Sequence, residues 1–432
     1  MGLFHRFRKA ISRVVIMGLD GTPYSLLQDL IKKGEMPNLT GIISQGYFGP
    51  MKVSLPEVSS VSWSSFMTGT NSGEHGIYGF MDVRPGTYEL YFPNFRDLKV
   101  PTLFDELGGQ NKKSIVINLP STYPAREIPG ILISGFVAID LKKAVYPPSL
   151  LPRLEELDYR IDVDVSKARD DPDFLIKDLH STLEARERIA HDLWKDYDWD
   201  LFMLVITGTD RLHHFLFDAY EDENHPYHQA FLEYYQKVDK VIAHFHHLTS
   251  NLKSPISHFL LLSDHGFTKI KSEVYLNRWL VENDYLRFKK EKPESLADID
   301  KGSKAFALDP SRIYINLKNK YPQGEVTQGD YHRVRQELKE SLLDLKLDGQ
   351  PVLQDIFFKE DLYSGPYLDM GPDLILLPYA GFDLKGSVQK EAIFGRSKLQ
   401  GMHTYDDAFF FSDRGARCES IFEVKGLIKQ FV

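Results

Sequence analysis

Long apolar runs that alternate with amphipathic helical patterns constrain this sequence more than any other feature. Each run is apolar at consecutive positions, as expected for strands that are buried on both faces. The expected strands lie within residues 12–21, 112–120, 130–136, 199–210 and 256–266. Residues 172–195 and 228–248 show the spacing of amphipathic helices instead. We therefore predict an α/β fold with a mostly parallel central sheet and helices on both of its faces.

The periodicity changes near residue 275, where shorter apolar stretches surround a new helical pattern. These segments are 311–317, 330–346, 351–363 and 372–378. The sequence then returns to a core-like pattern near residue 396. We therefore predict a core made of residues 1–274 and 396–432, interrupted by a smaller α+β insertion at residues 275–395.

The composition argues against several broad classes of protein. The chain has 432 residues, 42% hydrophobic and 26% charged, as in globular proteins with a large core. Its formal net charge of -9 argues against binding of duplex nucleic acid or anionic membranes. The basic residues within 1–13 are expected to form a solvated tail. The apolar run that follows is too short for a signal peptide or a transmembrane segment, so we expect a cytoplasmic protein. Nothing in the pattern indicates an oligomeric state.

Three predicted strands end in acids, which are Asp20, Asp210 and Asp264. The carboxyl ends of parallel strands meet at one edge of a sheet, where ligands collect. Three carboxylates at that edge would repel one another unless a cation neutralised them. Cys418 is the only cysteine, which rules out an internal disulfide and a thiolate metal cage. Any bound metal must therefore be held by His, Asp and Glu.

Imidazoles accompany two of these acids. His214 lies four residues after Asp210, so both would share one helix face, and His265 directly follows Asp264. A further histidine, His403, stands in "LQGMHTYDD". Three Asp and three His suit zinc first and manganese second. Taken singly, each has an ordinary explanation, such as a helix cap or a loop residue.

A nucleophile is expected in "LPEVSSVSWSSFMTGTNSGEHGI", where five serines at residues 59–65 lead into a short helix predicted at 64–70. A serine hydroxyl is a weak nucleophile at neutral pH, but a cation and a helix N-terminus can activate it. Serines before a helix are also common as caps. The composition alone does not say which serine acts.

Six motifs together resemble the alkaline phosphatase superfamily, closest to its type I phosphodiesterase/nucleotide pyrophosphatase branch. They are "GLDG", "MPNLTGIISQG", "MTGTNSGEHGI", "TDRLHH", "SDHGF" and "GMH", and they occur in the family's order. The resemblance covers residues 13–270 and 395–416. It implies two divalent metal ions, zinc or manganese, and a small-molecule phosphate ester as the substrate.

The resemblance also implies a role for each matching residue. Ser59 would be the nucleophile that forms a phosphoseryl intermediate, with Ser60 as its rival. One cation would be held by Asp20, Ser59, Asp264 and His265, and the other by Asp210, His214 and His403. His213 is expected to pack rather than to bind metal.

The sequence departs from the family pattern at Phe80, where nucleotide pyrophosphatases carry Asn, and at Val61, where relatives often carry Pro. The preference for diesters or monoesters therefore stays open. Specificity is expected in the insertion and near Trp63, Tyr78 and Phe80. The alternatives are a phosphomonoesterase, a phosphonate hydrolase or a phosphoglycerate mutase of the same superfamily, or a catalytically silent metal-stabilised binding protein. A sulfatase is disfavoured because "SSVSW" lacks the Pro and Arg that formylglycine formation requires.

Overall fold

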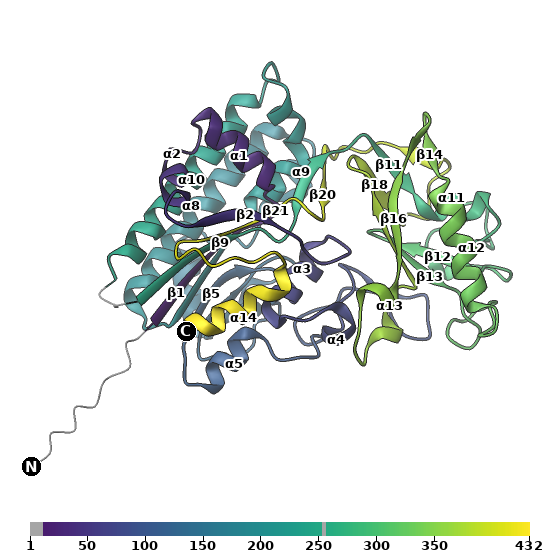
Figure 1. The fold of residues 1–432 in the computed structure, drawn as a ribbon, viewed down its shortest axis with the longest axis horizontal. Coiled ribbons are helices and arrows are strands. Elements are labelled where there is room, and N and C mark those ends of the chain that lie inside the picture. The colour runs from purple at the N-terminus through teal and green to yellow at the C-terminus, as the bar shows by residue number, and fades with distance from the viewer. Residues whose placement is uncertain (1–11, 253–255) are drawn as a thin grey trace, which may run out of the picture.

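An eight-stranded sheet forms the centre of the larger part of the molecule (Figure 1). The computed structural model describes residues 12–252 and 256–432, so nearly all of the expected basic tail lies outside the described residues. The strand order is β2-β21-β9-β1-β8-β5-β6-β7. The bounds are β1 (Ser12–Leu19), β2 (Tyr47–Met51), β5 (Ser114–Leu119), β6 (Gly130–Ser134), β7 (Val145–Tyr146), β8 (Leu201–Ile206), β9 (Ile256–Leu262) and β21 (Ala408–Ser412).

The five strands from β9 to β6 run parallel, and the strands at both ends of the sheet run antiparallel to their neighbours. β1 lies between β8 and β9, with Leu19 opposite Ile206 and Gly18 opposite Leu262. The carboxyl ends of these three strands therefore lie side by side. The predicted fold class is confirmed.

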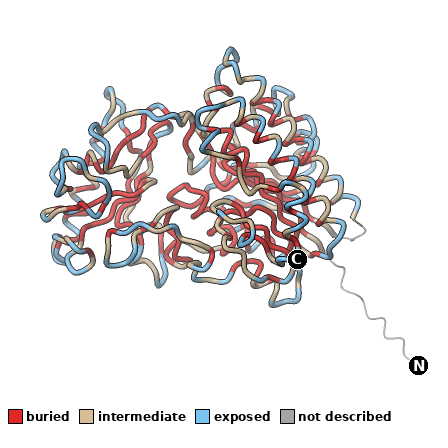
Figure 2. Tube along the Cα trace, turned by 180° about the vertical axis from the view of Figure 1, so that it is seen from behind, coloured by how far each residue is buried: buried red, intermediate tan, exposed pale blue. Residues whose placement is uncertain are grey.

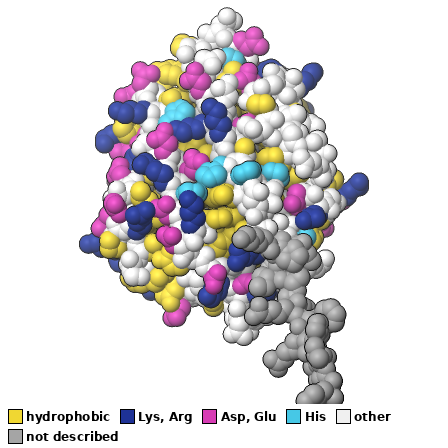
Figure 3. Space-filling model, turned by 90° about the vertical axis from the view of Figure 1, so that its left-hand side faces the viewer, with side chains coloured by type: hydrophobic (Ala, Val, Ile, Leu, Met, Phe, Trp, Pro, Cys, Tyr) yellow, Lys and Arg dark blue, Asp and Glu magenta, His cyan; other side chains and the backbone are white. Residues whose placement is uncertain are grey.

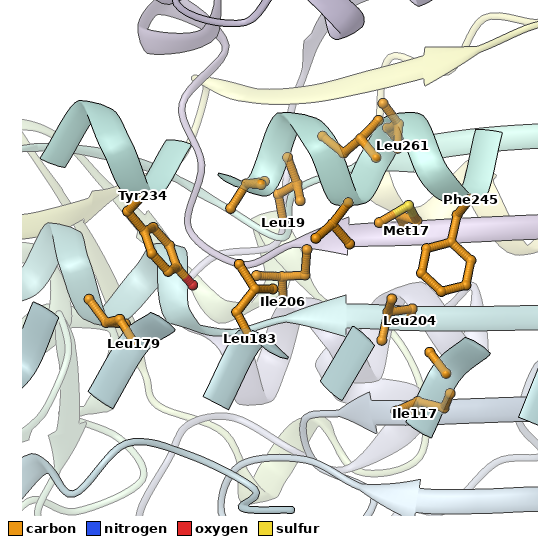
Figure 4. Packing of buried hydrophobic residues seen from close by; sticks show 14 of the residues in the cluster. Met17, Leu19, Ile117, Leu179, Leu183, Leu204, Ile206, Tyr234, Phe245 and Leu261 are labelled. Atoms are coloured by element: carbon orange, nitrogen blue, oxygen red, sulfur yellow. The ribbon is translucent and has the colours of Figure 1, made fainter. Parts of the chain in front are cut away.

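Long helices cover one face of the sheet. They are α1 (Tyr24–Lys33), α2 (Pro37–Ile43), α8 (Pro172–Asp196), α9 (Gly208–Glu221) and α10 (His228–Ser250). Alternate strand residues such as Met17 and Leu204 pack against Leu183 and Phe245 of these helices (Figure 4). The outer surface of the molecule seen in Figure 3 carries Lys and Arg side chains interspersed with Asp and Glu.

The opposite face of the sheet is covered by α3 (Ser59–Thr68), α5 (Leu103–Gly109) and α14 (Ile421–Phe431). Here Val14 and Ile16 of β1 share a core with Trp63 and Phe66 of α3. Both faces of β1 are therefore buried, as its uninterrupted apolar sequence predicts. Figure 2 shows these buried segments at the centre of the molecule.

Short elements connect the two layers. They are α4 (Ser72–His75), β3 (Asp82–Val83), β4 (Leu90–Tyr91), η1 (Leu141–Lys143), η2 (Pro148–Leu150), α6 (Leu151–Glu156) and α7 (Val165–Ala168). The antiparallel pair β10 (Gly266–Lys269) and β20 (Gly401–Thr404) places Phe267 opposite His403. This pair returns the late part of the chain to the sheet edge.

The remaining elements lie to one side of the large sheet and have a hydrophobic core of their own (Figure 1). A three-stranded sheet joins β11 (Ser272–Tyr275), β18 (Phe382–Lys385) and β19 (Phe394–Gly395). A four-stranded sheet contains β12 (Ala305–Leu308), β13 (Arg312–Ile315), β16 (Leu353–Phe358) and β17 (Leu374–Pro378). The other elements are α11 (Leu276–Glu282), η3 (Leu296–Asp298), α12 (Tyr331–Leu343), β14 (Lys346–Leu347), β15 (Gln350–Pro351), α13 (Lys359–Leu362) and η4 (Leu368–Met370). The domain limits drawn at 275 and 395 stay a prediction.

A buried ion pair attaches this second part to the first. The Arg312 guanidinium on β13 donates to the Asp82 carboxylate on β3 and to the backbone oxygen of Met81. Arg312 is fully buried, so these partners are needed to offset the cost of burying its charge. None of the helices in residues 12–252 and 256–432 combines the length and the apolar composition that crossing a bilayer requires.

Candidate metal centre

A glycine turn directly after β1 organises the sheet edge. Gly21 has a positive φ of 60°, a conformation that glycine adopts without strain. Its N–H donates to Asp264 Oδ1 at 3.0 Å, and its carbonyl oxygen lies 2.8 Å from His213 Nδ1. The turn therefore connects the ends of β1 and β9 to helix α9 and places Asp20 at the centre of the edge.

Asp20, Asp264 and His265 form the first group of possible metal ligands. One ligand atom from each of the three lies within 4.8 Å of the other two. All three side chains are buried, and His265 Nε2 lies 3.4 Å from Asp264 Oδ2 and 3.8 Å from Asp20 Oδ1. The backbone oxygen of Gly266 lies 3.0 Å from Nδ1 of the same ring and leaves Nε2 facing the acids.

Ser59 stands at the first position of α3 and faces this group. Its Oγ lies 3.3 Å from Asp20 Oδ1 and 3.1 Å from His265 Nε2. Ser60 is also buried, but its Oγ has no hydrogen-bond partner among the described residues. The geometry therefore brings Ser59, and not its neighbour, into contact with the acids and the imidazole.

The helix that carries Ser59 begins earlier than the sequence suggested. The prediction placed Ser59, Ser60 and Ser62 before a helix at 64–70, whereas α3 spans Ser59–Thr68 and includes them, so the predicted start of this helix is wrong. Ser64 Oγ donates to the Ser60 carbonyl oxygen and Thr68 Oγ1 to the Ser64 carbonyl oxygen, at 2.6 and 2.7 Å. These internal bonds let buried hydroxyls sit inside a helix instead of capping it.

Asp210, His214 and His403 form the second group. Asp210 lies in the first turn of α9, and His214 follows one turn later on the same face. His214 Nε2 is 3.5 Å from Asp210 Oδ1, and His403 Nε2 is 3.4 Å from the same oxygen. The two Nε2 atoms are 3.1 Å apart. Because His265 Nε2 is also 3.8 Å from Asp210 Oδ1, the two groups adjoin.

Burial and the neighbouring carboxylates disfavour the charged forms of the two acids in the first group. Burial, together with the nearby Asp264 and Asp210 carboxylates, raises the pKa of Asp20 well above its usual range. Burial also raises the pKa of Asp264 to about 6 and lowers that of His265 to about 3, which keeps the imidazole neutral. The buried carboxyl groups of Asp20 and Asp264 beside the neutral His265 imidazole form a site suited to a cation.

Two buried oxygens provide a test of whether the residues fit metal ions. Asp264 Oδ2 and Asp210 Oδ1 have no hydrogen-bond donor within the described part of the chain, and each lies in one of the two groups. Buried carboxylate oxygens without a partner are costly. Carboxylate oxygens and imidazole nitrogens at this spacing are ligands that zinc and manganese accept. The residues therefore fit the two divalent ions that the resemblance implies.

Sequence reasoning did not identify the residue that orients Asp210. Burial opposes ionisation of Asp210, but His214, His403 and Arg211 outweigh it and hold its pKa well below its usual range. Arg211 NH1 donates to Asp210 Oδ2 at 3.1 Å, and its Nε donates to Asp162 at 2.9 Å. The adjacency of Arg211 to Asp210 was visible in the sequence, whereas its pairing with a distant acid was not.

His213 lies beside the two candidate ligand groups, and its ring nitrogens contact other partners. Its Nδ1 lies 2.8 Å from the Gly21 carbonyl oxygen and its Nε2 lies 2.8 Å from the Tyr235 hydroxyl. Both ring nitrogens are therefore engaged, and burial lowers the pKa of this imidazole to about 4. The geometry agrees with the packing role expected for His213.

Two of the three aromatic residues expected near the substrate do not line the cavity beside the site. Trp63 is fully buried and donates its Nε1 hydrogen to Asp20 Oδ2 at 3.3 Å. Tyr78 is also buried, and its hydroxyl donates to the Tyr367 carbonyl oxygen. Only Phe80 lines the cavity that opens beside His214. Trp63 therefore contacts an acid of the site from the packed interior, Tyr78 is packed away from the cavity, and the specificity roles expected for these residues stay a prediction.

The sequence matches the type I phosphodiesterase/nucleotide pyrophosphatase family over residues 14–406. The match spans most of the chain, and the chain belongs to this family, as the motifs indicated. The family is metal-dependent, and its membership supports hydrolysis of phosphate esters. No curated protein matches the sequence.

Solved structures with the same fold include members with different activities. Phosphonoacetate hydrolase from Sinorhizobium meliloti, solved with phosphonoacetate, superposes with a TM-score of 0.66 at 16% identity and covers 98% of this chain and 96% of its own. An inactive murine ectonucleotide pyrophosphatase/phosphodiesterase 5 in complex with AMP gives 0.58 at 12% identity, with coverages of 97% and 94%. The human protein of the same name gives 0.55 at 12% identity, also with 97% and 94%. At these identities the likeness establishes the fold.

Proposed function

We propose that this protein is a two-metal hydrolase of small-molecule phosphate esters in which Ser59 is the nucleophile. The single observation that carries this proposal is the position of the Ser59 hydroxyl, between Asp20 and His265 at the start of α3. Two divalent ions held by the two ligand groups, with zinc preferred, would neutralise charge on the phosphoryl group and lower the pKa of bound hydroxyls.

The side chains supply the remaining steps. Ser59 gives up its hydroxyl proton to solvent as Oγ attacks phosphorus, so that the phosphoseryl bond forms and the bond to the leaving oxygen breaks. The leaving oxygen takes up a proton from solvent as the alcohol departs. Water then hydrolyses the phosphoserine and restores the hydroxyl. The first turn of α3 presents backbone N–H groups that can bind the phosphoryl oxygens. Helix α3 therefore both positions the nucleophile and binds the anion.

Replacing Ser59 tests the nucleophile directly. Ser59→Ala is expected to lower kcat about a thousandfold or more on p-nitrophenyl mono- or diesters, because an essential nucleophile is lost. Metal content, measured by mass spectrometry, is expected to stay near that of the parent protein. Ser60→Ala is the matched control and should retain most activity. Loss of turnover in Ser60→Ala alone would move the nucleophile by one residue.

A substrate panel separates the remaining family activities. Phosphate monoesters, diesters, phosphonates and sulfate esters should be assayed with added zinc and then with manganese. Turnover of a phosphate ester that depends on added metal supports the proposal. Metal binding without hydrolysis of any ester, unaffected by Ser59→Ala, would favour the catalytically silent binding protein.

A further inference from the structure

A cavity of about 210 Å³ opens beside the second ligand group. His214 and His403 form its inner wall, and strand β18 with residues 309–311 of the neighbouring part forms the outer wall. The cavity is smaller than the roughly 300–1,000 Å³ typical of sites for drug-sized ligands. It adjoins the place where a phosphoryl group would lie, so a substituent of the ester can occupy it.

Acidic residues outnumber basic ones in the cavity wall. The wall contains Glu57, Asp309 and Asp383 but one cation, Lys385. Lys385 Nζ lies 2.7 Å from Asp383 Oδ2 on the same strand, so its charge is already neutralised. The wall therefore provides no free cation that could hold a second anionic group. The carboxyl groups of Glu57 and Asp309 are not part of the ion pair between Lys385 and Asp383.

The unpaired carboxyl oxygen of Glu57 indicates that a ligand in this cavity carries a hydrogen-bond donor. Its side chain is only 5% exposed, and its Oε2 has no partner among residues 12–252 and 256–432. The backbone of Glu57 is fixed, because its carbonyl oxygen lies 2.8 Å from His403 Nδ1. A buried acceptor that is held in place and left unpaired is satisfied when a ligand brings the donor.

The rest of the wall suits an organic cation. The Phe80 ring lines the cavity together with Met81 and Met402. Phe80 is held in place by Phe136, whose ring is stacked on it with the centroids 5.1 Å apart. An aromatic face beside carboxylates attracts an ammonium group through both charge and the ring quadrupole.

We propose that this cavity binds a small ester substituent that carries a protonated amine, such as a 2-aminoethyl group. The amine donates to Glu57, lies near Asp309 and contacts the Phe80 ring. This inference rests on the proposed phosphate ester hydrolysis, since it assigns the substituent of that same substrate.

Three esters of matched size test the charge preference. They are 2-aminoethyl phosphate, propyl phosphate and phosphoglycolate, with the corresponding glycerol diesters used if monoesters are not hydrolysed. The kcat/KM for the 2-aminoethyl ester is expected to exceed that for the propyl ester about tenfold, as a charge-assisted hydrogen bond provides. The anionic ester should be the poorest. Equal values for all three, or preference for the anionic ester, would overturn the inference.

Variants of the wall locate the preference. Glu57→Gln is expected to bring the ratio of 2-aminoethyl to propyl kcat/KM close to one, and Asp309→Asn to lower it partly. Glu291→Gln, at an exposed site away from this cavity, is the matched control and should keep the ratio. If Lys385→Met instead abolishes selectivity while Glu57→Gln preserves it, the cavity recognises an anion and the inference fails.

A binding measurement separates this inference from the proposed function. Ser59→Ala protein with added zinc is titrated calorimetrically with 2-aminoethyl phosphate and with propyl phosphate. About tenfold tighter binding of the amine, lost in Ser59→Ala/Glu57→Gln, supports the cavity assignment even if no ester is hydrolysed. Equal affinities would overturn it even if generic phosphodiester hydrolysis is observed.

Discussion

Two buried aspartates, one in each part of the molecule, differ in how their oxygens are satisfied. Asp373 in the insertion is fully buried and accepts from Lys359 Nζ at 3.1 Å, the Tyr331 hydroxyl at 2.5 Å and the Ile315 N–H at 2.7 Å. Asp264 at the sheet edge is equally buried, yet its Oδ2 has no donor in the described part of the chain. The protein itself satisfies the Asp373 carboxylate, whereas the Asp264 carboxylate keeps one oxygen that a bound ligand could satisfy.

The largest expected effect comes from breaking the satisfied network. Lys359→Met leaves the Asp373 charge buried without its cation, so the free energy of unfolding should fall by about 3–5 kcal/mol. Denaturant unfolding measures the change, with Lys346→Met at an exposed position as the control. A loss of stability similar to that of the control would show that Asp373 does not depend on Lys359, and the contrast with Asp264 would fail.

The second prediction contrasts adjacent histidines. His214→Ala should lower turnover about a hundredfold and remove one metal ion per chain, because it deletes an imidazole from the second group. His213→Ala should keep both ions and lower stability instead, since its ring nitrogens contact Gly21 and Tyr235. Metal analysis and thermal unfolding distinguish the two variants, and the reverse result would reassign the ligand.

The third prediction concerns removal of metal. Stripping the ions with a chelator should lower the free energy of unfolding by about 2.7 kcal/mol for each ion that had been present at a hundred times its Kd. Hydrogen exchange should increase at the carboxyl ends of β1 and β9 and remain unchanged around Asp373.

The same experiment on Asp264→Asn makes the comparison sharper. The metal-free variant should be at least as stable as the metal-free parent, because one repelling carboxylate is gone while the bond from Gly21 can persist. It should show no stabilisation when zinc is returned. A marked loss of stability in the metal-free variant would mean that Asp264 is structural.

The smallest effect is expected at a partly buried acid near the surface, Glu106. Burial of Glu106 acts to raise its pKa, but Lys425 and Lys429 outweigh this and hold the pKa below its ordinary value of 4.5. A lowered carboxyl pKa adds stability above that ordinary value, and the contribution is lost as the pH falls through the folded-state pKa. Glu106→Gln should therefore cost below about 1 kcal/mol at neutral pH, and the difference should shrink on acidification. Unfolding at several pH values measures it.

The sequence predicted the parts of the site that follow from strand ends. Asp20, Asp210 and Asp264 follow apolar runs, and parallel strands place such positions at one edge. The contacts between distant segments were not predictable in this way, because Asp162 reaches Arg211 and Glu57 reaches His403 only after the layers pack. The buried serines of α3 were misassigned for a related reason, since propensity treats them as caps.

The wall of the cavity beside His214 also could not be predicted in full from the sequence. Phe80 was marked by its departure from a family pattern, while Asp383 and Lys385 carried no signal in the sequence. Their place depends on which edge of the insertion faces the sheet, and this is set by contacts such as that between Arg312 and Asp82. Local patterns do not encode that orientation.

The turn at Gly21 limits how this protein could be altered. A Cβ at this position would lie 3.0 Å from His265 Cε1 and 3.1 Å from Asp210 Oδ1, one atom from each ligand group. Even alanine would thus push the halves of the centre apart while straining its own backbone. Attempts to change which ion the protein accepts must therefore work through the donor side chains, because the spacing between them depends on a residue that has none.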